Sequence, residues 1–237
     1  MKSPILKPEE YSSLLEEVIQ YFDEHCVYRV HPEYQASEYH PKGKIVSVNP
    51  GSYGTYNMFS RRLTQNVKML RKVSKLLLHN ICVDMNDENP KRQLAGTESS
   101  SIPVILGIAY EAEECGIDLN TFTVKKSRKP GGLFNYVEGI PNKNPVLLID
   151  DNVHSGSSLW VSIAVCLHEL KLSISDSVYC ILYHRTEKDV LIKYQDLNTM
   201  LTVKPLFYRS SLNIKYDPDR YWIPDDVVQN LSNTFSY

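Results

Sequence analysis

The sequence predicts an α/β fold, in which a mostly parallel central sheet is flanked by helices and preceded by an N-terminal helix and a β-rich segment. Two observations support this class. From about residue 102 to residue 203, short apolar segments that read as strands alternate with segments of helical spacing, as in βαβ units. One apolar run ends in two aspartates, which places carboxylates where parallel sheets bind ligands. The 237 residues suffice for one such domain with additions.

The first part of the chain is predicted to contain two helices. The first is Pro8–His25, because apolar residues recur there at helical spacing and the proline suits a first turn. Residues 26–59 are rich in tyrosine, proline and glycine and are predicted to be irregular or β-rich. The second helix is Phe59–Ile81, with apolar side chains on one side. Residues 84–101 read as a polar connection.

The second part of the chain supplies the predicted sheet. The predicted strands are Ile102–Leu106, Thr121–Lys125, Pro145–Ile149, Ser177–Tyr183 and Met200–Val203, and the predicted helices are Tyr110–Cys115, Ser157–Leu170 and Glu187–Tyr194. We expect three regions. They are an N-terminal helix and extension over residues 1–43, the α/β domain over 44–208 and a C-terminal arm over 209–237.

The composition limits the partners and the location that we expect. A net charge of −2 provides no overall basic field, so we expect no nucleic-acid partner. No apolar run is long enough to span a membrane, and the first residues lack the apolar segment of a signal peptide. The five cysteines are scattered without a CxxC pair, which argues against zinc and is typical of a reduced, cytoplasmic protein.

The stretch VLLIDDNVHSGSSL, residues 146–159, carries the clearest chemistry. The side chains of Asp150 and Asp151 point to opposite sides of an extended backbone, at the end of the strand where ligands bind. Carboxylates accept hydrogen bonds from hydroxyl groups and can clamp a sugar diol. Gly156 lies among three serines at the start of a helix, where backbone amides and the dipole favour an anion. The stretch therefore predicts a sugar-phosphate site rather than an ordinary capped turn.

This stretch resembles the phosphoribosyl-pyrophosphate (PRPP) motif of type I phosphoribosyltransferases. In that family the two acids hold the ribose hydroxyls, which implies this role for Asp150 and Asp151. The small, hydroxyl-rich loop of the family holds the 5′-phosphate. The resemblance implies that role for His154, Ser155, Gly156, Ser157 and Ser158. His154 departs from the family pattern, in which threonine or aspartate is common; it is either a proton carrier for the acceptor base or an added donor in the phosphate loop.

A second stretch, KKSRKPGGLFNYVEG at residues 125–139, resembles the flexible catalytic loop of orotate phosphoribosyltransferases. By itself it reads as a solvated basic turn. The resemblance implies a catalytic role for Lys129 and contacts to pyrophosphate from Lys125, Lys126 and Arg128. Gly131 stands where the family has histidine. In that family the loop often reaches into the neighbouring subunit, which implies a homodimer.

Two further stretches complete the resemblance. ILGIAYEA, residues 105–112, resembles the pyrophosphate loop that follows the first strand, with Ala109 and Tyr110 matching the pattern. Glu111 stands where a lysine is common, and a carboxylate that faces a diphosphate is unfavourable. VNPGSYGTYNM, residues 48–58, resembles the hood that covers the base, and it reads equally as a β-hairpin with glycine turns.

The resemblance implies a phosphoribosyltransferase that binds PRPP with Mg²⁺ carried by the substrate, without direct protein ligands to the metal. The acceptor would be nucleobase-like, with pyrophosphate as the leaving group. The alternative is a non-catalytic sensor of PRPP or a nucleotide, or an effector component, that acts through a protein partner. A P-loop or dinucleotide-binding protein is not indicated, because neither GxxxxGK[ST] nor a GxGxxG after a strand occurs.

Overall fold

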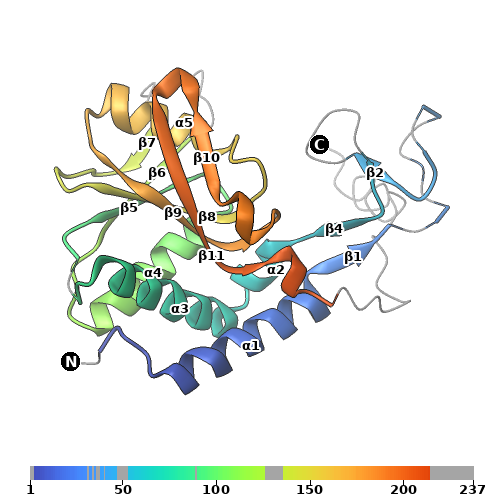
Figure 1. Ribbon diagram of the computed structural model, residues 1–237, viewed down its shortest axis with the longest axis horizontal. Helices are drawn as coiled ribbons and strands as arrows, with labels where there is room; N and C mark the ends of the chain where they lie inside the picture. Colours follow the sequence, from blue (N-terminus) through green and yellow to red (C-terminus); the bar gives the residue numbers. More distant parts are fainter. Residues whose placement is uncertain are drawn as a thin grey trace, which may run out of the picture.

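The structure, a computed structural model, describes residues 3–30, 32–33, 35, 38–39, 41–46, 53–88, 90–125 and 136–213. Its centre is a seven-stranded sheet with the order β10-β11-β9-β8-β5-β6-β7 (Figure 1). Strands β11, β9, β8, β5 and β6 run parallel, and the two edge strands pair antiparallel to their neighbours. The strands are β5 (Gln93–Thr97), β6 (Asn120–Val124), β7 (Val137–Gly139), β8 (Val146–Val153), β9 (Ile174–Tyr183), β10 (Leu191–Tyr194) and β11 (Thr199–Tyr208). The predicted fold class is confirmed.

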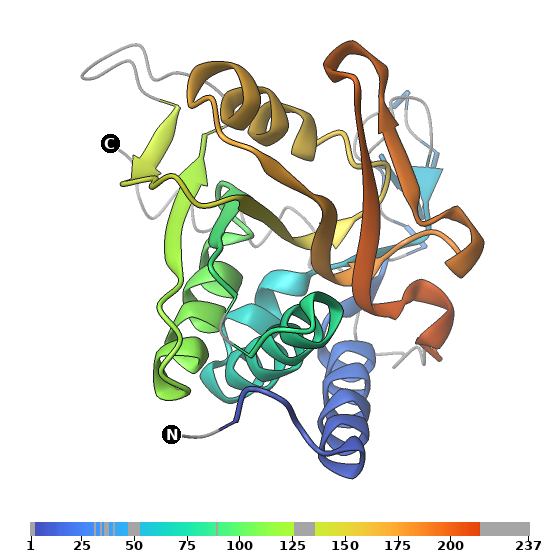
Figure 2. The same ribbon diagram turned by 60° about the vertical axis from the view of Figure 1, so that its left-hand side comes forward.

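Helices cover both faces of this sheet (Figure 2). One face carries α1, α3 and α4, and the other carries α5 with the turn of π-helix that continues it. The helices are α1 (Pro8–His25), α2 (Ser60–Thr64), α3 (Val67–Met85), α4 (Ile102–Glu114), α5 (Leu159–Ala164) and the π-helix η1 (Val165–Glu169). Short 3₁₀ turns η2, η3 and η4 occupy Glu187–Asp189, Gln195–Leu197 and Arg209–Ser211. Within the described ranges no helix is both long and apolar enough to cross a membrane.

Strand β8 explains why the sequence forms a doubly covered sheet. Leu147 and Ile149 pack into the core shared with α1, α3 and α4, whereas Val146 and Leu148 pack into the core under α5. All four side chains are fully buried, and burying each stabilises the fold by roughly 1.5–3 kcal/mol. A continuous apolar run is therefore what an inner parallel strand requires. The run also fixes β8 between the two layers, with its carboxyl end at the sheet edge.

The first strand of the sheet lies in a different segment from the one predicted from the sequence. The predicted strand Ile102–Leu106 is wrong, because these residues begin α4, with Pro103 in its first turn. Val104, Ile105, Ile108 and Ala112 then follow a helical spacing and are buried on one face. The actual strand, β5, lies inside the segment predicted to be a polar connection. Its small and polar residues are buried because β6 and β8 pair with it on both sides.

Two other predicted elements need correction. The helix Phe59–Ile81 is two helices, because the Asn66 side chain accepts a hydrogen bond from the Met69 amide and starts α3 anew. The helix Glu187–Tyr194 is wrong: η2 is followed by strand β10, whose residues alternate between exposed and buried. The helix Pro8–His25 is confirmed as α1.

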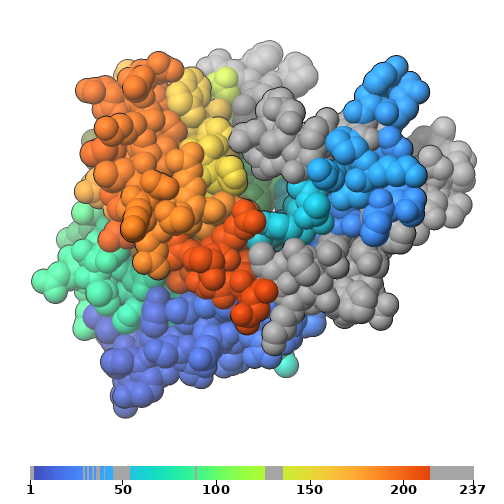
Figure 3. Space-filling view, turned by 45° about the vertical axis from the view of Figure 1, so that its right-hand side comes forward, coloured from blue at the N-terminus to red at the C-terminus, as the bar shows by residue number. Residues whose placement is uncertain are grey.

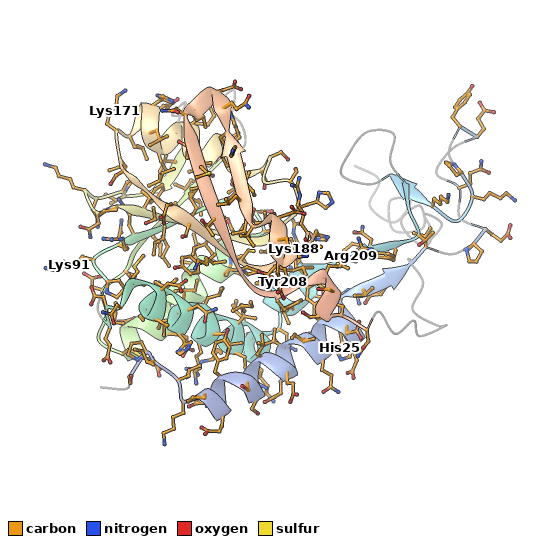
Figure 4. The ribbon with its side chains drawn as sticks, viewed as in Figure 1. His25, Lys91, Lys171, Lys188, Tyr208 and Arg209 are labelled. Atoms are coloured by element: carbon orange, nitrogen blue, oxygen red, sulfur yellow. The ribbon has the colours of Figure 1, made fainter. Side chains whose placement is uncertain are left out.

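Outside the sheet, the segment before α2 forms two small antiparallel pairs, β1 (Val27–Arg29) with β4 (Tyr56–Met58) and β2 (Ile45–Val46) with β3 (Tyr53–Gly54). Of the segment that resembles a hood, residues 48–52 lie outside the described residues. Strand β4 lies beside the chain that leaves β11, where the Arg209 guanidinium sits 5.0 Å from the centre of the Tyr56 ring (Figures 3 and 4). The pair β1/β4 thus leads the chain toward the carboxyl ends of the sheet strands.

Candidate functional site

A cavity of about 310 Å³ opens where β5 and β8 end and α2 begins. It lies at the carboxyl edge of the parallel strands, which is where α/β sheets bind ligands. Three segments far apart in the sequence meet there: the start of α2, the loop after β5 and the end of β8. The lining residues are Met58, Phe59, Ser60, Arg61, Thr97, Glu98, Ser100, Asp150, Asp151, Asn152 and Ser158.

Asp150 is buried on the α5 side of β8. Its Oδ1 accepts a hydrogen bond from the Asp151 amide at 2.9 Å, and its Oδ2 accepts one from the Ser158 hydroxyl at 3.2 Å. Burial, and then the neighbouring charge of Asp151, raise the pKa of Asp150 well above its ordinary value. A carboxyl group in this state responds strongly to a ligand, because a bound hydroxyl or cation stabilises its charged form.

Asp151 is buried on the opposite side of the same strand, as the alternation of a strand requires. Its Oδ2 accepts a hydrogen bond from the hydroxyl of Ser60, the first residue of α2. This bond joins residues 91 positions apart in the sequence. It holds the start of α2 against β8 and so forms one wall of the cavity.

The loop after β8 is fixed by contacts with β10. Gly156 has φ +79°, a conformation that residues with a Cβ adopt with strain. A Cβ on Gly156 would lie 2.6 Å from the Tyr194 hydroxyl and 2.7 Å from Cδ1 of Ile192. The Tyr194 hydroxyl donates a hydrogen bond of 2.8 Å to the Gly156 carbonyl. Only glycine therefore fits this position without backbone strain and without moving the Tyr194 and Ile192 side chains of β10.

Two histidines lie close together just after β8 and β9, and neither is among the residues that line the cavity. The ring centres of His154 and His184 are 5.4 Å apart. Burial, with a smaller contribution from His154, lowers the pKa of His184 to about 4, while Asp151 acts in the opposite direction. Nδ1 of His154 and Oδ1 of Asn152 are buried and have no hydrogen-bond partner among the described residues. Buried polar atoms normally have partners, so both are available to a ligand or a water molecule.

Comparison with solved structures identifies the fold. A phosphoribosyltransferase from Corynebacterium diphtheriae is similar, with a TM-score of 0.60 and 19% identity over 84% of this chain and 98% of that chain. The chain has a phosphoribosyltransferase fold. An orotate phosphoribosyltransferase from Mycobacterium tuberculosis has a TM-score of 0.58 at 19% identity, over 86% and 99% of the two chains. A UMP synthase from Leishmania donovani has a TM-score of 0.57 at 15% identity, over 94% of this chain and 43% of that one.

At the level of sequence the similarity is weaker. No family model matches the chain, and no curated protein matches it. The overall similarity is thus recognised in the three-dimensional fold rather than across the whole sequence.

In this phosphoribosyltransferase fold, the structure describes only some of the residues predicted to bind pyrophosphate. Lys126, Arg128 and Lys129 lie outside the described residues. Lys125 follows β6, is 8% exposed, and its Nζ lies 2.7 Å from Oε1 of Glu138. The side chain is thus held in an ion pair at the sheet edge and is not among the residues that line the cavity.

The predicted pyrophosphate loop over residues 105–112 is wrong as a loop. Ala109 and Tyr110 lie within α4, where the Tyr110 side chain is exposed. Glu111 is buried against α3, with Oε1 2.7 Å from Nε of Arg71. Its carboxylate therefore packs between two helices and does not face a diphosphate in the cavity. The prediction failed together with the strand prediction on which it depended.

Sequence reasoning missed the loop that does follow the first strand. Thr97, Glu98 and Ser100 line the cavity there, and the Ser101 hydroxyl donates to the Thr97 carbonyl at 2.6 Å. It also missed Ser60 and Arg61 of α2 as lining residues. One signal was present: GTESSS is a hydroxyl-rich segment directly before a helix, as is HSGSS after β8. The residues before GTESSS are not apolar enough to indicate a strand there.

Proposed function

We propose that the protein binds PRPP and transfers its 5-phosphoribosyl group to a nucleobase-type acceptor, with release of pyrophosphate. The observation that carries the proposal is the pair of buried aspartates at the end of β8, which share a cavity with Ser158 at the end of the Gly156 loop. A diol clamp beside an anion-binding loop fits a sugar phosphate better than it fits any ligand that lacks either group.

The ribose and the 5′-phosphate occupy the β8 side of the cavity in this proposal. Asp150 and Asp151 accept hydrogen bonds from the 2′- and 3′-hydroxyls. The 5′-phosphate binds the loop formed by His154, Ser155, Gly156, Ser157 and Ser158. The hydrogen bond from Tyr194 to the Gly156 carbonyl supports that loop from behind. His154 either donates to the phosphate or carries the proton of the acceptor base, and its unpartnered Nδ1 is consistent with both roles.

Departure of the diphosphate requires cations, because negative charge develops on it as positive charge develops on the ribose. We propose Lys129 as the catalytic residue, with Lys125, Lys126 and Arg128 assisting. To reach the diphosphate, Lys125 would have to leave its ion pair with Glu138. The hydroxyl-rich loop after β5 lies on the diphosphate side of the cavity. Ala109 and Tyr110 are not part of this proposal.

A Mg²⁺ ion fits the chemistry of this site. Carboxylate oxygens are preferred ligands of Mg²⁺, and Glu98 and Asp151 both line the cavity. Within the described part of the chain no three His, Cys, Asp or Glu residues are grouped so that they could hold a metal. We propose that PRPP carries the ion, with Glu98 or Asp151 as the nearest protein oxygens. Bound there, Mg²⁺ would neutralise charge on the diphosphate.

The acceptor lies on the α2 side, where Met58 and Phe59 line the cavity and offer a flat apolar contact to a base. An orotate-like base is our first choice. We further propose that the protein is a cytoplasmic homodimer and has a protein partner. Residues 44–208 would form the catalytic domain, residues 1–43 an N-terminal helix and extension, and residues 209–237 a C-terminal arm, of which 214–237 lie outside the described residues.

A second candidate is a non-catalytic PRPP or nucleotide sensor that acts through a partner. The observation that favours it is the ion pair of Lys125 with Glu138, which withdraws one predicted cation from the diphosphate. A sensor binds PRPP and releases no pyrophosphate, whereas a transferase does both.

The test is pyrophosphate release from PRPP and Mg²⁺ with a panel of bases that includes orotate. We compare the wild type, Lys129→Ala and the control Lys193→Ala, which changes an exposed lysine of β10. The transferase proposal predicts release with at least one base, lowered about 100-fold or more by Lys129→Ala alone. PRPP binding without release for any base would support the sensor instead.

A further inference from the structure

Arg61 connects two walls of the cavity. It is the second residue of α2, its side chain is exposed, and it lines the cavity. One guanidinium nitrogen donates a hydrogen bond of 3.0 Å to the hydroxyl of Ser99, in the loop after β5. The neighbouring Ser60 is bonded to Asp151 at the same time. The backbone that carries Arg61 is thus tied to the ribose side, while its head group reaches the loop after β5.

Binding of a diphosphate in this cavity requires a cation near the loop after β5, because most of the charged lining residues are acidic. Glu98, Asp150 and Asp151 bring carboxyl groups, and Arg61 is the one cation among the described lining residues. A diphosphate in this space is repelled by Glu98 and Asp151 unless positive charge stands between them. An arginine suits this task, because its planar guanidinium has five donors and pairs with phosphate through two parallel hydrogen bonds.

The cations near Arg61 are directed elsewhere. Arg62 lies over the Tyr28 ring, with its guanidinium carbon 4.4 Å from the ring centre, and donates to the Tyr28 hydroxyl. Lys125 is paired with Glu138. Adjacent residues of one short helix therefore point to different surroundings, Arg61 toward the cavity and Arg62 toward β1.

We propose that Arg61 binds the diphosphate of PRPP and supplies, from α2, a cation that the loop after β5 lacks. The sequence of that loop, Thr97 to Ser101, contains hydroxyl groups and one carboxylate but no basic residue. Arg61 contacts the loop through Ser99, so a small rotation of its exposed side chain brings it onto a bound phosphate. The inference rests on the proposed function, and it adds a diphosphate-binding residue from outside the stretches that resemble the family.

The test compares ligands with and without the diphosphate. Calorimetry measures the binding of PRPP with Mg²⁺, of pyrophosphate with Mg²⁺ and of ribose 5-phosphate to the wild type, to Arg61→Gln and to Arg62→Gln. The Arg62 variant is the matched control, since it removes the same charge one residue away. Thermal unfolding of each variant confirms that it folds.

Arg61→Gln is expected to weaken the binding of PRPP and of pyrophosphate about tenfold or more. The binding of ribose 5-phosphate should be unchanged. Arg62→Gln is expected to bind all three like the wild type. Equal PRPP affinity of the wild type and Arg61→Gln, with ribose 5-phosphate bound, would overturn this inference alone. A folded wild type that binds neither PRPP nor ribose 5-phosphate would overturn the proposed function as well.

Discussion

The loop after β8 and the loop after β5 reach the same cavity but are held in different ways. The β8 loop is anchored by backbone geometry, since Gly156 takes a left-handed conformation against Tyr194 and Ser158 bonds to Asp150. The β5 loop is tied at its base by the Ser101 bond to the Thr97 carbonyl, whereas its exposed part contacts α2 through a side-chain bond from Arg61 to Ser99. We infer that the first loop is a preformed anchor for a phosphate. We expect the β5 loop to adjust its side chains to the diphosphate, which has to leave during the reaction.

Among changes to how the β8 loop is held, the largest effect is expected from Gly156→Ala. The alanine would have to keep a strained positive φ, and its Cβ would lie 2.6 Å from the Tyr194 hydroxyl and 2.7 Å from Cδ1 of Ile192, well inside van der Waals contact. The resulting strain costs roughly 1–3 kcal/mol. Because the loop must shift, ribose 5-phosphate binding should fall by roughly the corresponding factor, about 5- to 150-fold. Calorimetry with ribose 5-phosphate measures it.

The matched control for this change is Gly116→Ala. Gly116 also has a positive φ, +78°, but lies at the end of α4, away from the cavity. Its variant should lose stability and keep its affinity for ribose 5-phosphate. If both glycine variants lost affinity equally, the anchoring role of the β8 loop would be wrong.

A pH response is expected from His184, which follows β9 and contacts His154 of the β8 loop. The pKa of His184 is lowered from 6.5 to about 4 in the folded protein, so between these values the unfolded chain binds more protons and stability rises with pH. The shift corresponds to about 3 kcal/mol of unfolding free energy, which is lost as pH falls from about 7 to 4. His184→Gln should remove this part of the slope of unfolding free energy against pH, measured in urea. An unchanged slope would show that His184 is not held neutral.

A smaller effect is expected from Tyr194→Phe. The variant loses the hydrogen bond to the Gly156 carbonyl, which is worth about 1 kcal/mol, and ribose 5-phosphate affinity should fall about fivefold. The control is Tyr179→Phe, which loses a hydroxyl bond to Asp84 on the helix side of the sheet. It should lower the unfolding free energy by a similar amount while ribose 5-phosphate binds as before. Weaker binding in the control would mean that general loosening explains both results.

The same contrast explains what could be predicted from the sequence. The β8 strand and its loop were predictable because their signals are local: an apolar run, two acids, and a glycine among serines. β5 was not, because Gln93 to Thr97 are buried by pairing with β6 and β8 rather than by their own hydrophobicity. Once β5 was missed, the apolar start of α4 took its place, and Ala109 and Tyr110 were assigned to the wrong segment.

The contribution of α2 was unpredictable for a related reason. Ser60 and Arg61 act at the site only because the fold brings the start of α2 to the end of β8. In the sequence they stand 90 residues before Asp150 and Asp151, within a helix that also carries other basic residues. Nothing local distinguishes Arg61 from Arg62, although one lines the cavity and the other lies on Tyr28.

The most direct test of the account is calorimetry of PRPP with Mg²⁺ on the wild type and on Asp150→Asn/Asp151→Asn. An Asp196→Asn variant, which changes an exposed aspartate of η3, is the control. We expect binding by the wild type and the control, and a loss of about 100-fold or more in the double variant, because two hydrogen bonds to charged groups are removed. Equal binding by all three proteins would contradict the claim that the two aspartates form the sugar-phosphate site.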